Sequence, residues 1–151
     1  MTDVNRFYEG LRQARAVYDF TTGDDNMFFD RISLIGLTAE NFRKKGITSQ
    51  FVVLIHGPST KYVTRTLKGT KFEHDAGARL GEIQALLERL ALAGTIDLVV
   101  CGIAMARHLV AADNVVPYAT VEQNVAETSI ALQNQGYAYM QVDVLASPPR
   151  I

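Results

Sequence analysis

The sequence predicts an α/β protein: a three-layer α/β/α sandwich around a mostly parallel sheet of about five strands. Short runs rich in valine, isoleucine and aromatic residues alternate with stretches of helical periodicity. Two of these runs are almost continuously apolar, which is typical of strands covered by helices on both faces. The chain has 151 residues and contains no internal repeat, linker or low-complexity tract. We therefore expect one domain over residues 1–151, long enough to bury a core.

Four apolar runs predict the main strands of the sheet. They occupy residues 14–21, 51–56, 96–101 and 137–144. The stretch between the second and third runs, residues 57–75, fits no long element, and a loop of this length in a compact domain is often functional. We expect it to hold a short edge strand at residues 62–66. The core then covers about residues 14–143, between a short N-terminal segment and a frayed C-terminal tail, "ASPPRI".

Helical periodicity fills the spaces between these runs. From Asp25, apolar residues recur in steps of three and four on one stripe. Asp24 or Asp25 suits the N-cap of this helix, and Gly46 suits its end. A second helix is predicted over about residues 76–93.

The last long helix is predicted to begin at "TVEQ". Thr120 and Gln123 have the spacing of a capping box there, and Gly136 would end the helix. A short helix is also expected over about residues 103–110. Right-handed crossovers would then place helices on both faces of the sheet.

The charge balance and the apolar pattern exclude several classes of protein. Lysine and arginine number 15 against 16 aspartate and glutamate residues, so the basic excess of a nucleic-acid-binding protein is absent. No apolar run approaches the ~18 residues of a membrane span. The first residues lack a basic stretch followed by an apolar one, so we expect no signal peptide. We expect a cytoplasmic protein without nucleic-acid or membrane partners.

The chain has a single cysteine, Cys101. It cannot form an internal disulfide, which favours a reducing compartment. The phosphate-binding motifs G-x-x-x-x-G-K-[ST] and G-x-G-x-x-G are both absent. The cysteine pairs and the H-E-x-x-H pattern of zinc sites are absent too. We therefore expect no cofactor and no metal.

Two candidate functional residues stand at the ends of expected strands. His56 ends the second strand, in "LIHGPS", and Cys101 ends the third, in "VVCGIA". The carboxyl ends of parallel strands lie at the same edge of a sheet, so the two side chains are expected at one edge. Ligands of open α/β sheets bind at that edge. Gly102 leaves the sulfur unshielded, and the following helix N-terminus would stabilise a thiolate. Arg107 lies further along that helix and would add positive charge.

Each of these residues also has a purely structural interpretation. A free cysteine such as Cys101 is most often a small apolar core residue, and His56 also suits a satisfied polar strand terminus. His108 is expected to be exposed. Tyr137 and Tyr139 are expected to pack on a strand rather than to bind.

The stretch "HGPS" adds candidates for a pocket: Gly57, Pro58 and Ser59, together with Gly102. Ser59 beside His56 would suit hydrolase or transferase chemistry. This is the weakest reading, because the G-x-S-x-G elbow and an orienting acid are both absent from the pattern.

Three segments together resemble the DsrE/DsrF-like (YchN-like) proteins of sulfur relay: "FVVLIHGPS", "LLERLALAGTIDLVVCGIAMARHLV" and "VEQNVAETSIALQNQGYAYMQV". The likeness lies in a strand ending in H-G-P, a strand ending in one cysteine before a short helix, and an "LQ-x-x-GYA" junction. The resemblance covers roughly residues 14–143. The order and spacing of the three motifs together make it specific.

The resemblance implies a three-layer α/β/α fold and homotrimers or hexamers. It implies that Cys101 matches the family cysteine, which carries sulfur as a persulfide in relay members. Arg107 matches an arginine often seen after that cysteine, whereas His108 replaces the glycine that commonly follows.

Two functions follow as hypotheses. The first is a sulfur carrier or sulfurtransferase-type relay component acting through Cys101, with His56 and Arg107 as supporting residues and a sulfur donor or acceptor protein as partner. A lone cysteine suits this role, because sulfur passes to a thiol on another molecule. The alternative is a non-enzymatic ligand-binding or interaction module of the same fold, in which Cys101 is structural and residues 57–75 shape a pocket between subunits.

Overall fold

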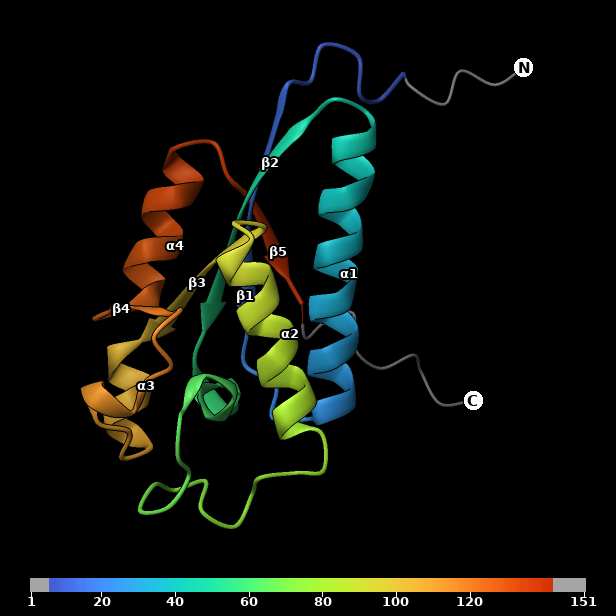
Figure 1. Cartoon of the computed structure of the whole chain (residues 1–151). Coiled ribbons are helices and arrows are strands. Elements are labelled where there is room, and N and C mark those ends of the chain that lie inside the picture. The colour runs from blue at the N-terminus through green and yellow to red at the C-terminus, as the bar shows by residue number, and fades with distance from the viewer. Residues whose placement is uncertain (1–5, 143–151) are drawn as a thin grey trace, which may run out of the picture.

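Five parallel strands form the central sheet of the computed structural model, which describes residues 6–142 (Figure 1). The strands lie in the order β4-β3-β2-β1-β5. Their bounds are β1 Gln13–Phe20, β2 Thr48–Ile55, β3 Ile96–Cys101, β4 Thr120–Glu122 and β5 Ala138–Gln141. The helices are α1 Asp25–Lys44, α2 Leu80–Leu92, α3 Gly102–Arg107 and α4 Val125–Asn134, with short 3-10 helices η1 Gly57–Val63 and η2 Ala112–Asn114. The predicted fold class is confirmed.

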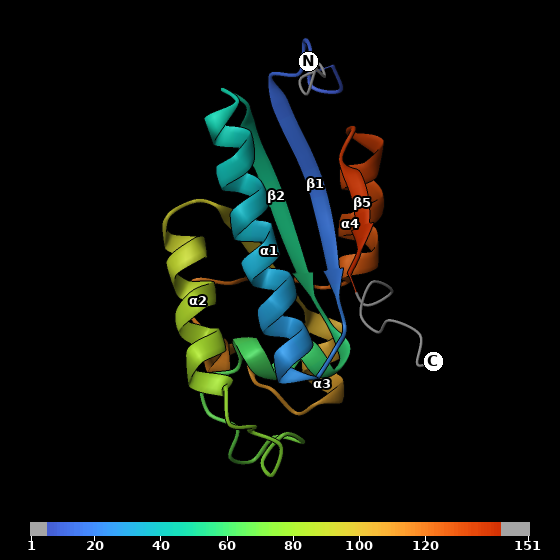
Figure 2. The ribbon, with the colours of Figure 1, turned by 90° about the vertical axis from the view of Figure 1, so that its right-hand side faces the viewer.

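Helices cover both faces of the sheet. Figure 1 shows α1 and α2 on one side and α4 on the other, and Figure 2 looks through α1 and α2 onto β1 and β2. Successive side chains of a strand alternate between the two faces. Tyr18 and Val53 therefore join the core under α1 and α2. Val17, Leu54 and Cys101 join the smaller apolar cluster on the α4 side.

The sequence located the long strands well. The first three apolar runs correspond to strands at residues 13–20, 48–55 and 96–101, and the fourth corresponds to 138–141. The predicted end of that last strand, residues 143–144, and the tail "ASPPRI" lie outside the described residues. Continuous apolar runs are reliable here because both faces of the central strands are buried.

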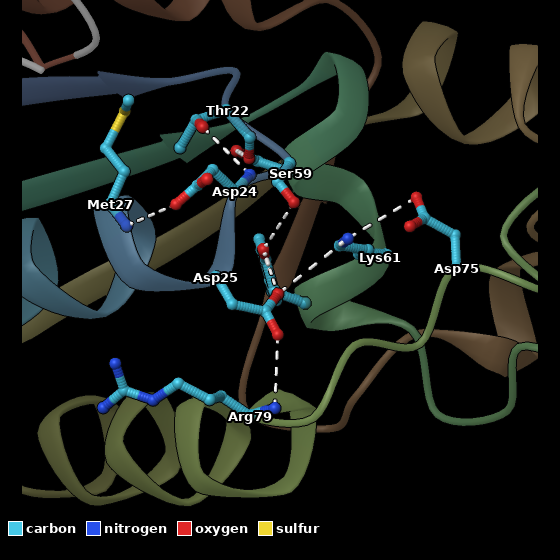
Figure 3. Close-up of polar contacts among 10 residues, drawn as sticks. Thr22, Asp24, Asp25, Met27, Ser59, Lys61, Asp75 and Arg79 are labelled. Carbon is cyan, nitrogen blue, oxygen red and sulfur yellow. Dashed lines mark hydrogen bonds and ion pairs between the residues drawn. The ribbon is translucent and has the colours of Figure 1, made fainter. Parts of the chain in front are cut away.

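The ends of α1 are as predicted. The carboxylate of Asp24 accepts a hydrogen bond from the Met27 N–H at 2.8 Å, which caps the helix (Figure 3). At the other end, Gly46 adopts a φ of +74°, the left-handed conformation that follows a helix C-terminus.

Helix α2 begins at Leu80, four residues later than predicted. Gly77 has a φ of +71°, which breaks the helix, and a Cβ there would collide with the carboxylate of Asp25. The Arg79 N–H donates to the same carboxylate at 3.2 Å (Figure 3). Contact with the first turn of α1 therefore decides where α2 starts.

The edge strand predicted at residues 62–66 is wrong. Residues 57–63 form η1 instead, and only Thr64 makes an isolated β-bridge, with Val115. Tyr62 is fully buried, and its hydroxyl donates to Asp25 at 2.7 Å. A proline at the second position of η1 suits the start of a helix and not a strand interior.

Lys61 is buried beside the same carboxylate. Its Nζ lies 3.9 Å from Asp25 and 3.5 Å from Asp75 (Figure 3). This ion-paired cluster fastens η1 and the chain before α2 to the start of α1.

The capping box predicted at Thr120 and Gln123 is also wrong. Residues 120–122 form β4, which pairs with β3 from Val99↔Thr120 to Cys101↔Glu122. The N-cap of α4 is Asn124, whose side chain accepts from the Ala126 N–H at 3.0 Å. The backbone of residues 120–122 bonds to the sheet, so the helix starts only after it.

Candidate functional site

A cavity of about 600 Å³ opens at the carboxyl ends of the strands, on the α4 side of the sheet. The ends of β1, β2 and β3, together with β5, α3 and α4, contribute to its lining. Four of the residues that the sequence analysis proposed as catalytic or pocket residues line it: His56, Gly57, Cys101 and Arg107. This is the edge of the sheet at which α/β proteins bind ligands.

The strand register explains why His56 and Cys101 line the same cavity. Ile55 of β2 pairs with Val100 of β3, so the next residues of the two strands are His56 and Cys101. Neighbouring residues of parallel strands point to the same face and lie about 4.8 Å apart at the backbone. Both side chains therefore face α4, as their place in the cavity lining shows.

A carboxylate that sequence reasoning missed, Asp19, organises one wall of the cavity. Its Oδ1 is hydrogen-bonded to Nε2 of His56, and its Oδ2 accepts from the Tyr139 hydroxyl at 2.8 Å. The three residues come from β1, the end of β2 and β5. Tyr139, which was expected only to pack, thus lines the cavity and donates a hydrogen bond to Asp19. The one usable signal was that Asp19 is the only acid of its strand.

The electrostatics of Asp19 follow from two opposing effects. Burial alone would raise the pKa of its carboxyl, but the hydrogen bonds from His56 and Tyr139 and the charge of His56 outweigh burial and lower it. An ionised Asp19 accepts a hydrogen bond from Nε2–H of His56. In the neutral ring, Nδ1 is then the nitrogen that accepts a proton.

Cys101 forms part of the cavity wall with little exposed surface. Only 6 % of the residue is accessible, and it belongs to the apolar cluster that includes Leu54 and Val125. Its sulfur lies 3.9 Å from the Gln123 carbonyl oxygen. Cys101 is also the N-cap residue of α3, and its side chain makes no capping hydrogen bond. Cys101 is thus a buried residue in the wall of the cavity.

Arg107 and His108 complete the basic side of the cavity. Arg107 is exposed and makes no ion pair among residues 6–142. His108, predicted to be exposed, is half-buried: its ring stacks on Phe72 at 4.6 Å, and Nδ1 donates to the Ala104 carbonyl at 2.8 Å. The apolar face of the imidazole explains the difference, because it covers Phe72 at the end of α3.

Three of the pocket candidates do not line this cavity: Pro58, Ser59 and Gly102. Ser59 is fully buried, and its hydroxyl donates to the Thr22 carbonyl at 2.6 Å (Figure 3). Gly102 lies against Gln123, where a Cβ would come within 3.0 Å of its side-chain oxygen. These residues shape the backbone around the site.

Within residues 6–142, no group of three or more histidine, cysteine or acidic side chains is placed to hold a metal ion. None of the helices in that range has the length and apolarity needed to cross a membrane.

Comparisons with known proteins agree with this architecture. An uncharacterised protein of Aquifex aeolicus (strain VF5) is 34% identical over 126 residues, which cover 83% of this chain and 55% of the relative. The chain thus spans about half the length of that relative. A solved structure, a protein of unknown function from Methanobacterium thermoautotrophicum, has the same fold, with a TM-score of 0.65 and 13% identity over 85% of this chain and 98% of that one. The sequence model of the DsrE/DsrF-like family matches residues 8–142, so the chain belongs to the DsrE/DsrF-like family.

Proposed function

We propose that this protein carries sulfur as a persulfide on Cys101, as a relay component or sulfurtransferase-type carrier. The observation that supports the proposal most strongly is that the single cysteine lines a cavity together with a histidine bonded to a carboxylate. The sulfur of a cysteine must be deprotonated to act as a nucleophile. A base beside it and an opening to small reactants meet both needs.

His56 has the role of proton acceptor in this proposal. Asp19 receives Nε2–H, which leaves Nδ1 to take the thiol proton. The Asp19 carboxylate then stabilises the imidazolium, as a carboxylate does wherever it orients a catalytic histidine. Arg107 would stabilise negative charge at the mouth of the cavity. The resemblance to relay proteins adds a cytoplasmic location, assembly as a trimer or hexamer, and a sulfur donor or acceptor protein.

Sulfur loading of the purified protein tests the function. Native protein is treated with inorganic polysulfide, separated from it, and weighed by intact-mass spectrometry. We expect a gain of one sulfur atom that is removed by a reducing thiol. Cys101→Ser should gain none. Equal gain by the wild type and Cys101→Ser would overturn the proposal.

A second function, a non-enzymatic ligand-binding module, is favoured by one observation: Cys101 packs in an apolar cluster and is only 6 % exposed. Cys101→Ala would then leave assembly and ligand binding intact, and native protein would not take up sulfur. The loading experiment distinguishes the two functions directly.

A further inference from the structure

The position of Cys101 restricts which molecules reach its sulfur. The residue is 6 % exposed and faces the cavity instead of the outer surface. A cysteine of a partner protein would have to bring its backbone to the opening of the cavity. A free small molecule reaches the sulfur without that constraint, so we take a small molecule as the donor and leave a protein as the acceptor.

The size and wall of the cavity indicate an organic molecule. Its volume of about 600 Å³ falls within the range of small-molecule sites, about 300–1,000 Å³. An inorganic sulfur anion of a few atoms would leave most of it empty. Apolar side chains of α3, α4 and β2 form much of the wall, among them Leu54, Ile103 and Ile130. They offer surface to a carbon skeleton.

The charges of the lining indicate an anion. The one acid among the cavity-lining residues, Asp19, is already bonded to His56 and Tyr139. Arg107 lines the same cavity, and no acid of residues 6–142 pairs with it. A guanidinium binds a carboxylate through paired, charge-assisted hydrogen bonds. Arg107 is therefore available to a carboxylate on the ligand.

We propose that the sulfur donor is a low-molecular-weight organic persulfide that carries a carboxylate, an inference that rests on the function proposed above. Its carboxylate binds Arg107, and its carbon skeleton lies against the apolar wall. The Cys101 thiolate attacks the outer sulfur of R–S–SH. The S–S bond of the donor breaks, and its electron pair leaves on R–S⁻. A new S–S bond forms on Cys101: R–S–SH + Cys–S⁻ → R–S⁻ + Cys–S–SH. No oxidant or reductant is consumed.

The test compares a donor that has free carboxylates with one in which the carboxylates are esterified. Glutathione persulfide and the persulfide of glutathione diethyl ester are offered to native protein, and the rate of sulfur gain is followed by intact mass. Inorganic polysulfide serves as the donor without a carbon skeleton. The variants are Arg107→Gln and a matched control, Arg89→Gln, which removes an exposed cation of α2 on the other side of the sheet. Binding of S-methylglutathione, measured by calorimetry, reports recognition without sulfur transfer.

We expect the acid persulfide to load Cys101 about tenfold faster than its ester. Arg107→Gln should remove this preference and weaken S-methylglutathione binding about tenfold, whereas Arg89→Gln should keep both. Thermal unfolding of Arg107→Gln checks that the variant is folded.

Two outcomes overturn the proposal in different ways. Equal loading by acid and ester, or an unchanged preference in Arg107→Gln, would reject the carboxylate-bearing donor while sulfur carriage by Cys101 stands. Failure of all three donors to load native protein would reject both this proposal and the proposed function.

Discussion

Asp19 and His56, which stand at the carboxyl ends of adjacent parallel strands, are hydrogen-bonded side chain to side chain in the wall of the cavity that contains Cys101. The contact fixes the orientation of the imidazole and decides which of its nitrogens carries a proton. His56 is therefore more than a polar strand terminus.

His56→Gln is expected to slow sulfur uptake by Cys101 by about a hundredfold or more, because proton transfer by a positioned histidine contributes about that factor. His74→Gln is the matched control, since His74 is exposed in the loop before α2. The measurement is the initial rate of sulfur gain by intact mass. Equal rates in the two variants would show that His56 takes no part.

Asp19→Asn is expected to reduce the loss of unfolding free energy that the protein shows at acid pH. The pKa of the native carboxyl is below its ordinary value, so folding favours the ionised form. The ionised carboxylate therefore stabilises the folded protein above the pKa of about 4 that an Asp has in the unfolded chain. This stabilisation is lost as the pH falls through the lower pKa of Asp19 in the native protein. Urea unfolding between about pH 7 and pH 2 measures it. Asp97→Asn, at an exposed site on β3, is the control. If Asp19→Asn follows the same curve as the wild type, shifted by a constant, the assignment is wrong.

Tyr139→Phe should cost about 1 kcal/mol of unfolding free energy, the net value of a hydrogen bond. The change removes the hydroxyl that donates to Asp19 and keeps the ring. Tyr137→Phe is a matched control two residues away, because the Tyr137 hydroxyl makes no hydrogen bond within residues 6–142. Denaturant midpoints of both variants check the difference, and equal losses would contradict the role of Tyr139.

Gly77→Ala should destabilise the protein by at least about 1 kcal/mol. Its φ of +71° disfavours a side chain, and the new Cβ would collide with Asp25. Gly81→Ala, within α2 and with open space at its Cβ, should instead be neutral or stabilise by up to about 1 kcal/mol. Thermal unfolding of the pair is decisive: a neutral Gly77→Ala would mean that the contact does not hold the start of α2.

The sequence pattern predicted the parts of the fold whose side chains are buried in a regular period. Strands β1 to β3 and helix α1 fall in this class. The placement of His56 and Cys101 at the same edge of the sheet could also be predicted, because it needs only parallel neighbouring strands. Strand β4 escaped prediction because its three residues are all exposed and show no apolar pattern. The start of α2 escaped because it depends on the distant carboxylate of Asp25.

Asp19 and Tyr139 were missed for a further physical reason. They are 120 residues apart in the chain and meet only because β5 returns to lie beside β1. Strand order is a property of the assembled sheet and leaves no local periodicity in the sequence. The hydrogen bond between Tyr139 and Asp19 could therefore be found only once the topology was known.

The most direct measurement is the rate at which iodoacetamide labels Cys101 in the native protein, compared with the urea-unfolded protein, by intact mass. With one cysteine in the chain, every label reports the same sulfur. We expect iodoacetamide to label Cys101 in the native protein, and His56→Gln to slow the labelling of the native protein but not that of the unfolded one. Labelling that occurs only after unfolding would mean that the cavity does not lead to the sulfur, and it would contradict the proposed role of Cys101.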